Sequence, residues 1–325
     1  MKVLVTGGAG FIGGNFVQYM LKKYPQYTIY NLDALTYAGD LTKHVDFEKN
    51  PQYRFIKADI ADATVINEAF EKHQFDYVVH FAAESHVDRS IKEPEIFVKT
   101  NVLGTQVLLN AAKNIGVKKF VHVSTDEVYG DLEFDPTTFF TEQTPLQPNS
   151  PYSASKASSD MMVRAYHETF GLPVNITRCS NNYGPYHFPE KLIPLTISRV
   201  LNDEKVPVYG TGENVRDWLH VLDHCSAIDL VMHEGVNGEV YNVGGHNEKT
   251  NLEVVQTIIK ALNKSEELIT FVEDRLGHDK RYAIDPTKLE ALGWKPTYNF
   301  DTGIEQTIQW YLENENWWST IISGD

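Results

Sequence analysis

A threonine and two adjacent carboxylates stand where an apolar segment of the sequence ends. Residues 120–123 are apolar, and they are followed by Ser124-Thr125-Asp126-Glu127 and, after a short interval, by Gly130. Ligands of open parallel sheets bind outside the carboxyl ends of the strands, so this position is a candidate for chemistry. Two adjacent carboxylates can act as general acid and general base if their surroundings separate their pKa values. Elimination of water needs such a pair.

A second reactive pair follows a proline-rich loop. Tyr152 and Lys156 stand four residues apart in a segment with a helical pattern that ends at Gly171. They therefore lie on one helical face, about 5.4 Å apart along the axis. A cation so close favours the phenolate and is expected to lower the tyrosine pKa. A tyrosine tuned in this way is a candidate general base for a sugar or alcohol hydroxyl.

The N-terminal residues have the pattern of a dinucleotide site. A β-branched run at residues 2–6 leads into the glycine-rich loop 7–13, and an apolar-periodic helix follows. Either Gly8-x-Gly10-x-x-Gly13 or Gly7-x-x-Gly10-x-x-Gly13 fits the fingerprint, in which glycines let backbone N–H groups approach a pyrophosphate.

The acids after the next two predicted strands point to the adenosine half of the cofactor. Asp33 ends a strand at residues 28–32 and lies 20 residues after Gly13, the separation expected for a carboxylate on the ribose hydroxyls. It would repel a 2′-phosphate, and no arginine adjoins it, so NAD is favoured over NADP. Asp59, at the end of a strand over residues 54–60, is a candidate for the adenine amino group or a simple turn residue.

Alternating strands and helices continue to residues 174–178, after which shorter strands and loops take over. The alternation predicts an α/β fold with a doubly wound parallel Rossmann sheet. A continuous helix is expected from Pro94 to about Asn114. We expect an NAD-binding domain at residues 1–178, to which residues 217–247 return. A smaller C-terminal α+β substrate domain is expected at residues 179–216 and 248–325.

Two segments of the second half suit a phosphorylated ligand. Residues 180–194 are rich in amides and aromatic side chains, which fit a polyhydroxylated ligand with a base. Residues 273–282 form the densest polar cluster of this half, and with Arg216 they supply cations for a diphosphate. A domain-crossing loop and a solvated charge run are the alternatives. His86 and Asp88 follow a strand end, but no His-Glu-x-x-His pattern supports a metal site.

Composition excludes several classes of protein. The chain has 325 residues and a formal charge of −15, which argues against binding to nucleic acid. No apolar run reaches the ~18 residues that span a bilayer, and the first apolar run breaks at Gly7. Cys179 and Cys225 cannot form a disulfide framework. We therefore expect a cytoplasmic protein without a membrane or nucleic-acid partner.

The loop 7–13, the strand end 124–130 and Tyr152-x-x-x-Lys156 together resemble the extended short-chain dehydrogenase/reductase family of nucleotide-sugar enzymes. The match is similar to the branch of 4,6-dehydratases that act on dTDP-glucose, and it covers nearly the whole chain. Its most specific part is Thr125-Asp126-Glu127, because related epimerases typically lack the Asp-Glu pair. Leu276 is a departure, since the family usually has proline there.

The resemblance implies a role for each reactive residue. Tyr152 takes the proton of the sugar C4 hydroxyl while C4 gives hydride to NAD, and Lys156 lowers the tyrosine pKa and holds the nicotinamide ribose. Thr125 hydrogen-bonds the C4 oxygen. Glu127 removes the C5 proton, and Asp126 protonates the departing C6 hydroxyl. The hydride then returns to C6, so NAD is regenerated and is expected to stay tightly bound.

The resemblance also implies the ligand-binding residues. For NAD these are Gly7, Gly10, Phe11, Ile12, Gly13, Asp33, Thr36, Asp59, Ile60, Phe81, Ala82, Ala83, Ser85, Thr100, Tyr152, Lys156 and Asn182. For the nucleotide sugar they are Ser85, Thr125, Asn181, Lys191, Leu192, Pro207, Tyr209, Arg216, Asn251, Arg275, His278 and Tyr282. No metal ligand is expected. A homodimer is implied, and the apolar surface of the helices after Pro94 and Tyr152 supports it.

Two other functions stay open on sequence alone. A 4-epimerase or decarboxylase of the same family would act on a UDP- or GDP-sugar, and an epimerase would keep the C6 oxygen. A non-catalytic NAD-binding regulator would need neither the Tyr-Lys pair nor the acid pair. The sequence also leaves open whether the sugar nucleotide carries thymidine or uridine, because one methyl group changes the binding free energy by only ~1–3 kcal/mol.

Overall fold

A parallel sheet forms the centre of the larger part of the fold. The structure is a computed structural model that describes residues 1–39, 41, 47, 49–274 and 276–323. Within those residues seven strands pair in the order β10-β6-β5-β4-β1-β2-β3, all parallel. Their bounds are β1 (Lys2–Thr6), β2 (Thr28–Asp33), β3 (Tyr53–Lys57), β4 (Tyr77–His80), β5 (Lys119–Thr125), β6 (Val174–Cys179) and β10 (Val240–Val243). The strand order reverses between β1 and β4, which opens a crevice at their carboxyl ends.

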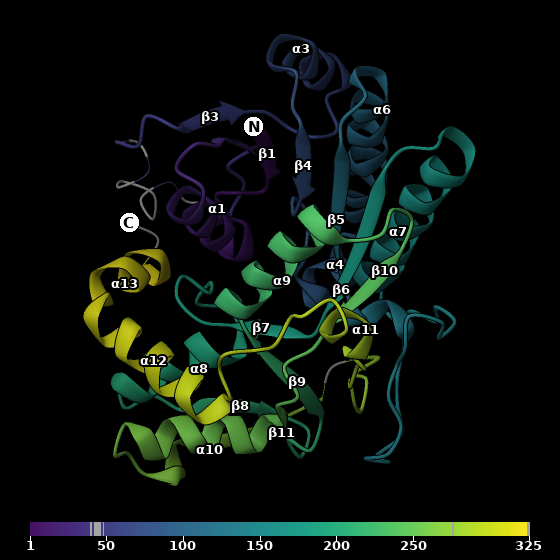
Figure 1. The fold of residues 1–325 in the computed structure, drawn as a ribbon. Coiled ribbons are helices and arrows are strands. Elements are labelled where there is room, and N and C mark those ends of the chain that lie inside the picture. The colour runs from purple at the N-terminus through teal and green to yellow at the C-terminus, as the bar shows by residue number, and fades with distance from the viewer. Residues whose placement is uncertain (40, 42–46, 48, 275, 324–325) are drawn as a thin grey trace.

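Helices cover both faces of this sheet (Figure 1). One face packs against α1 (Phe11–Lys23) and α9 (Val221–Glu234), and the other against α3 (Ala63–His73), α6 (Thr105–Ile115) and α7 (Pro151–Phe170). The first strand shows why the sequence does this. Val3 and Val5 point into one core and Leu4 into the other, and all three are fully buried. A strand covered on both faces reads as a continuous apolar run.

The smaller part of the fold is mixed α and β, and it lies at the other end of the molecule from α3 (Figure 1). Strands pair in the order β11-β9-β7, and β12 pairs with β8. Around them lie α8 (Leu192–Leu201), α10 (Asn251–Ala261), α12 (Phe300–Glu313) and α13 (Glu315–Ser323). The strands are β7 (Asn181–Tyr183), β8 (Val206–Tyr209), β9 (Val215–His220), β11 (Glu248–Thr250) and β12 (Ile269–Val272). The doubly wound sheet with a smaller α+β unit is thus confirmed.

The chain crosses between the two parts more often than the sequence suggested. β9 belongs to the small sheet, so the return to the large sheet begins with α9. A later segment, including α11 (Thr287–Glu290), also packs on the large sheet, because Leu289 and Trp294 are buried in its core. The Lys288 ammonium lies 2.6 Å from a carboxylate oxygen of Glu239, beside β10.

The helix expected after Pro94 is not a continuous α-helix. It consists of α5 (Pro94–Phe97), a π-helical segment, η2 (Val98–Gly104), and then α6. The buried Asn101 in η2 exchanges hydrogen bonds with the backbone N–H and carbonyl of Glu84, and its amide also donates to Ser155. Such π segments are frequent at functional sites, and this one fixes the chain that follows β4.

A buried polar cluster lies beneath the carboxyl ends of β5 and β6. The Arg178 guanidinium donates to the Asp160 carboxylate at 2.9 Å and to the Tyr129 hydroxyl at 3.0 Å. The Nε2 atom of His122 lies 3.4 Å from the other oxygen of Asp160. Breaking a buried charge pair by removing one partner typically costs about 3–5 kcal/mol, so this cluster ties α7 firmly to the sheet.

Three buried histidines predict a loss of stability in mild acid. Burial lowers the pKa of His122 and of His220 to about 4 and that of His224 to about 3. These rings are neutral when folded but take a proton near pH 6.5 when unfolded. The free energy of unfolding is therefore unaffected by these rings above about pH 6.5. As the pH falls from there toward 4, it decreases by about 1.4 kcal/mol per pH unit for each ring.

Urea unfolding between about pH 7 and pH 5 measures this effect as a falling free energy of unfolding. A His122→Gln variant should show a shallower fall than the unaltered protein, because one proton fewer is taken up on unfolding. Identical slopes for the two proteins would contradict the assignment.

Candidate active site

A cavity of about 440 Å³ lies along the carboxyl edge of the large sheet. It is bordered by the ends of β1, β2, β4 and β5, by the start of α7 and by residues 179–192 of the smaller part. The structure brings every expected cofactor residue to its wall: Gly7, Gly10, Phe11, Ile12, Gly13, Asp33, Thr36, Asp59, Ile60, Phe81, Ala82, Ala83, Ser85, Thr100, Tyr152, Lys156 and Asn182.

The glycine loop packs so closely that side chains are excluded. Gly7 has φ +73°, and a Cβ atom there would lie 2.7 Å from the backbone nitrogen of Ala82. A Cβ atom on Gly13 would lie 2.3 Å from the carbonyl oxygen of Gly7. Gly8 instead packs against Asn31 and does not border the cavity, so the cavity-facing frame is Gly7-x-x-Gly10-x-x-Gly13. This loop leaves the N-terminus of α1 facing the cavity, as pyrophosphate binding requires.

Asp33 stands at the end of β2 and is held by two backbone donors. The N–H groups of Ala9 and Leu35 donate to its two carboxylate oxygens at 3.0 and 2.8 Å. Asp59 also borders the cavity, and it accepts a hydrogen bond from the N–H of Ala61 at 2.9 Å, so it caps a turn there. The glycine cradle, the helix N-terminus and Asp33 together fit NAD.

The Tyr-Lys pair lies on the first turns of α7. Pro151 at N1 and a capping box between Ser150 and Ser153 start this helix, which directs Tyr152 and Lys156 into the cavity. The Lys156 ammonium donates to the carbonyl oxygen of Val123 at 2.8 Å. Burial lowers the pKa of Lys156 to about 8.

The pKa of Tyr152 is not lowered overall in this structure, although the pairing with Lys156 was expected to lower it. Burial raises the pKa of Tyr152 well above its ordinary value, and the nearby Glu127 carboxylate raises it further. The Lys156 ammonium donates to a strand carbonyl and not to the phenol. The loss of water around the phenol is the main cause of its raised pKa.

The acid pair begins a short 3₁₀ helix, η3 (Asp126–Tyr129), directly after β5. Thr125 caps it by accepting a hydrogen bond from the N–H of Glu127 at 3.2 Å, and its hydroxyl also donates to Asp126 at 3.4 Å. Gly130 then turns the chain with φ +96°, where a Cβ atom would lie 2.5 Å from the carbonyl oxygen of Gln147.

The two carboxylates stand in different surroundings. Asp126 is fully buried, whereas Glu127 borders the cavity. Burial raises the pKa of Asp126 well above its ordinary value, and the charges of Glu127 and Asp217 raise it further. The raised pKa favours the protonated carboxyl group, which is the form that can protonate a leaving group.

The structure brings only some of the expected nucleotide-sugar residues to the cavity wall. Ser85, Thr125, Asn181, Lys191 and Leu192 border the cavity. Outside its wall, Arg216 lies 4.3 Å from the centre of the Tyr282 ring and donates to the carbonyl of Asp279 at 2.9 Å.

The remaining nucleotide-sugar candidates are more scattered. Pro207 and Tyr209 lie on β8, and the Tyr209 ring is 6.3 Å from that of His278. Asn251 begins α10. Arg275 lies outside the described residues. Leu276, the departure from the family pattern, has 82% of its surface exposed.

Several wall residues were not identified from the sequence, among them Tyr37, Glu84, Cys179, Ser180, His187, Phe188, Glu190 and Trp218. The Tyr37 hydroxyl donates to Glu190 at 3.3 Å, and the rings of Tyr37 and Phe188 meet edge to face at 5.8 Å. Phe188 and Glu190 belong to residues 180–194, the segment expected to suit a phosphorylated ligand. Nothing local in the sequence indicates that two segments so far apart meet across one cavity.

No helix in the described ranges is both long and apolar enough to cross a bilayer. Those ranges also contain no group of three or more His, Cys, Asp or Glu side chains that could hold a metal ion.

Known proteins resemble this chain over its whole length. The family model described as GDP-mannose 4,6 dehydratase matches residues 4–307. A dTDP-glucose 4,6-dehydratase of Xanthomonas campestris pv. campestris (strain B100) is 52% identical over 340 residues, which cover 99% of this chain and 96% of the relative.

Solved structures agree with this match. A dTDP-glucose 4,6-dehydratase from Bacillus anthracis in complex with NAD has a TM-score of 0.92 at 52% identity over 99% of both chains. Its counterpart from Streptomyces venezuelae, with NAD and TYD bound, has a TM-score of 0.95 at 48% identity and covers 99% of this chain and 100% of that one.

Proposed function

The chain belongs to the GDP-mannose 4,6 dehydratase family, and on that premise we propose that it is an NAD-dependent dTDP-glucose 4,6-dehydratase. It converts dTDP-glucose into dTDP-4-keto-6-deoxyglucose and water. The relatives at about half identity over the whole chain are dTDP-glucose enzymes, which favours that substrate over a GDP-sugar. The observation that carries the proposal is the pair formed by the buried Asp126, whose pKa is raised by burial, and the cavity-facing Glu127.

Oxidation at C4 depends on the Tyr-Lys pair. Tyr152 takes the proton from the C4 hydroxyl, and Thr125 hydrogen-bonds the C4 oxygen. Lys156, which keeps a bond to the β5 carbonyl, stands one helical turn away to hold the cofactor ribose. NAD, when bound, supplies a positive ring that favours the phenolate, accepts the hydride of C4 and returns it to C6.

Elimination depends on the acid pair. The new 4-keto group acidifies C5, so the Glu127 carboxylate can remove the C5 proton from its position on the cavity wall. Asp126, which is neutral, protonates the departing C6 hydroxyl. After hydride has returned to C6, a proton returns to C5. The buried Asp126 is thus assigned as the acid and the cavity-facing Glu127 as the base.

A 4-epimerase or a decarboxylase is not favoured. An epimerase oxidises and reduces C4 without losing the C6 oxygen, so it has no use for a dedicated acid and base beside C5 and C6. A non-catalytic regulator would need none of these reactive residues, although all of them meet at one strand end here.

We also propose a cytoplasmic homodimer in a deoxysugar pathway of the dTDP-rhamnose type. The helices after Pro94 and Tyr152 present exposed apolar side chains: Val98 is 57% exposed, Leu103 47% and Met161 48%. A contiguous exposed apolar patch commonly marks a protein–protein contact, and the segments that carry these side chains, η2 and α7, pack against each other. Sedimentation of the purified protein distinguishes a dimer from a monomer.

The purified protein should turn over dTDP-glucose without added cofactor, because each cycle regenerates the NAD it carries. The 4-keto-6-deoxy product gives an ultraviolet chromophore in alkali, which makes it easy to measure. UDP- and GDP-hexoses run in parallel report the base preference. No chromophore with any of these sugar nucleotides would contradict the proposal.

Removing the acid pair should separate the two half-reactions. In the Asp126→Asn, Glu127→Gln double variant, dehydration should fall by at least about 100-fold, the usual contribution of acid–base catalysis. Oxidation at C4 should still appear as the absorbance of bound NADH. Glu168→Gln, which changes an exposed carboxylate near the far end of α7, is the matched control. Dehydration that survives in the double variant would show that the roles are misassigned.

A further inference from the structure

After the acid pair, the chain crosses at once to a segment near its C-terminal end. Leu132 forms an antiparallel bridge with Arg281, and its N–H donates to the Arg281 carbonyl at 3.2 Å. The Asp131 carboxylate accepts from the backbone N–H groups of Lys280 and Arg281 at 2.6 and 3.2 Å. The loop that leaves η3 is therefore bound along its first residues to this segment.

The same segment is bound on its other side to the strand that carries Arg216. The N–H of Val215 donates to the carbonyl of Lys280 at 2.8 Å, and the N–H of Tyr282 donates to the carbonyl of Val215 at 3.1 Å. Arg216 follows directly, and its guanidinium stacks on the Tyr282 ring. Residues 280–282, called the seam below, thus join the loop that follows the acid pair to the strand that carries Arg216. The seam itself contains Tyr282, and both side chains are proposed to bind the nucleotide.

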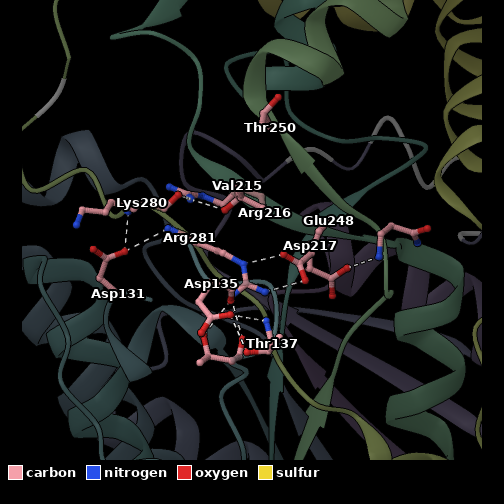
Figure 2. A network of polar contacts seen from close by, with 12 residues as sticks. Asp131, Asp135, Thr137, Val215, Arg216, Asp217, Glu248, Thr250, Lys280 and Arg281 are labelled. Carbon is pink, nitrogen blue, oxygen red and sulfur yellow. Dashed lines mark hydrogen bonds and ion pairs between the residues drawn. The ribbon is translucent and has the colours of Figure 1, made fainter. Parts of the chain in front are cut away.

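The side chain of Arg281 closes this seam (Figure 2). Nε and Nη2 donate to the two oxygens of Glu248 on β11 at 2.8 and 3.0 Å, a bidentate pair. Nη1 donates to the carbonyl oxygens of Asp135 and Thr138 at 2.8 Å each. The side chain is only 3% exposed. Lysine cannot reproduce this planar fork, so the geometry requires arginine.

Arg281 is not among the described residues that border the cavity, so it acts on the ligand only through its neighbours. Those neighbours are close to the chemistry. The charge of Glu127 raises the pKa of Tyr282, and the charges of Arg216 and Asp217 act on Asp126. The acid pair and the proposed nucleotide side chains are therefore close enough for their charges to interact. Tyr152 and Lys156 are anchored separately, by α7 and by the β5 carbonyl.

We propose that Arg281 is a positioning residue that fixes the position of Asp126 and Glu127 relative to Arg216 and Tyr282. The elimination of water depends on this relative position of the acid pair and the nucleotide side chains, whereas oxidation at C4 does not. The inference rests on the proposed function, because it assigns the acid pair to elimination.

Three variants test the proposal with dTDP-glucose as substrate. In Arg281→Met, product formation should fall at least tenfold and KM should rise. NADH absorbance should build up on the enzyme, because oxidation continues while elimination is slow. Arg281→Lys should behave similarly, since one ammonium cannot replace four directed donors. Glu248→Gln keeps an acceptor for the guanidinium and should give a smaller change of the same kind.

A merely structural role would give a different pattern. The control is Lys264→Met, which breaks an exposed ion pair with Asp203 in the same part of the fold and should leave both half-reactions unchanged. Retained NAD and the melting temperature are measured for every variant, and Arg281→Lys and Glu248→Gln suffice if Arg281→Met does not fold.

Equal loss of product and of NADH formation, or no loss of either, would overturn the proposal. An inactive wild-type protein would instead refute the proposed function, and this inference with it.

Discussion

The burial of the Asp126 carboxyl group at the end of β5 is the constraint on which the site depends. A carboxylate that loses its water and stands beside a second carboxylate is costly to ionise, so the group stays neutral instead. Glu127, one residue later, borders the cavity in which the sugar is proposed to react. Because they differ in burial, adjacent residues of the same chemical type can act as acid and as base.

The rest of the fold keeps that strand end in place. β5 is paired on both sides, with β4 and β6, and the buried Asp160–Arg178 pair ties α7 to the sheet beneath it. The reversal of strand order beside β1 opens the crevice for the cofactor. On the far side, the seam at Arg281 binds the loop after the acid pair to the substrate side. On the proposed roles, α7 holds the residues of hydride transfer, and the junction between the two parts holds the acid pair that eliminates water.

Local sequence patterns were enough to predict the sheet, the glycine loop, Asp33 and the helix that carries Tyr152, because each depends on short-range spacing. They were not enough where distant residues decide the outcome. The pKa of Tyr152 depends on its burial and on Glu127, and the π segment depends on contacts of Asn101 with Glu84 and Ser155. Likewise, Arg281 looked like one cation of a diphosphate site, but Glu248, far away in the sequence, makes it part of a buried ion pair.

The most direct test of this mechanism follows a single hydrogen atom. dTDP-glucose carrying deuterium at C4 is converted by the purified protein in ordinary water, and the product is examined by NMR. If one cavity holds NAD and the sugar through the whole cycle, deuterium will be found at C6, and C5 will carry hydrogen from solvent delivered through the acid pair. Loss of the deuterium to water, or its retention at C4, would contradict the mechanism.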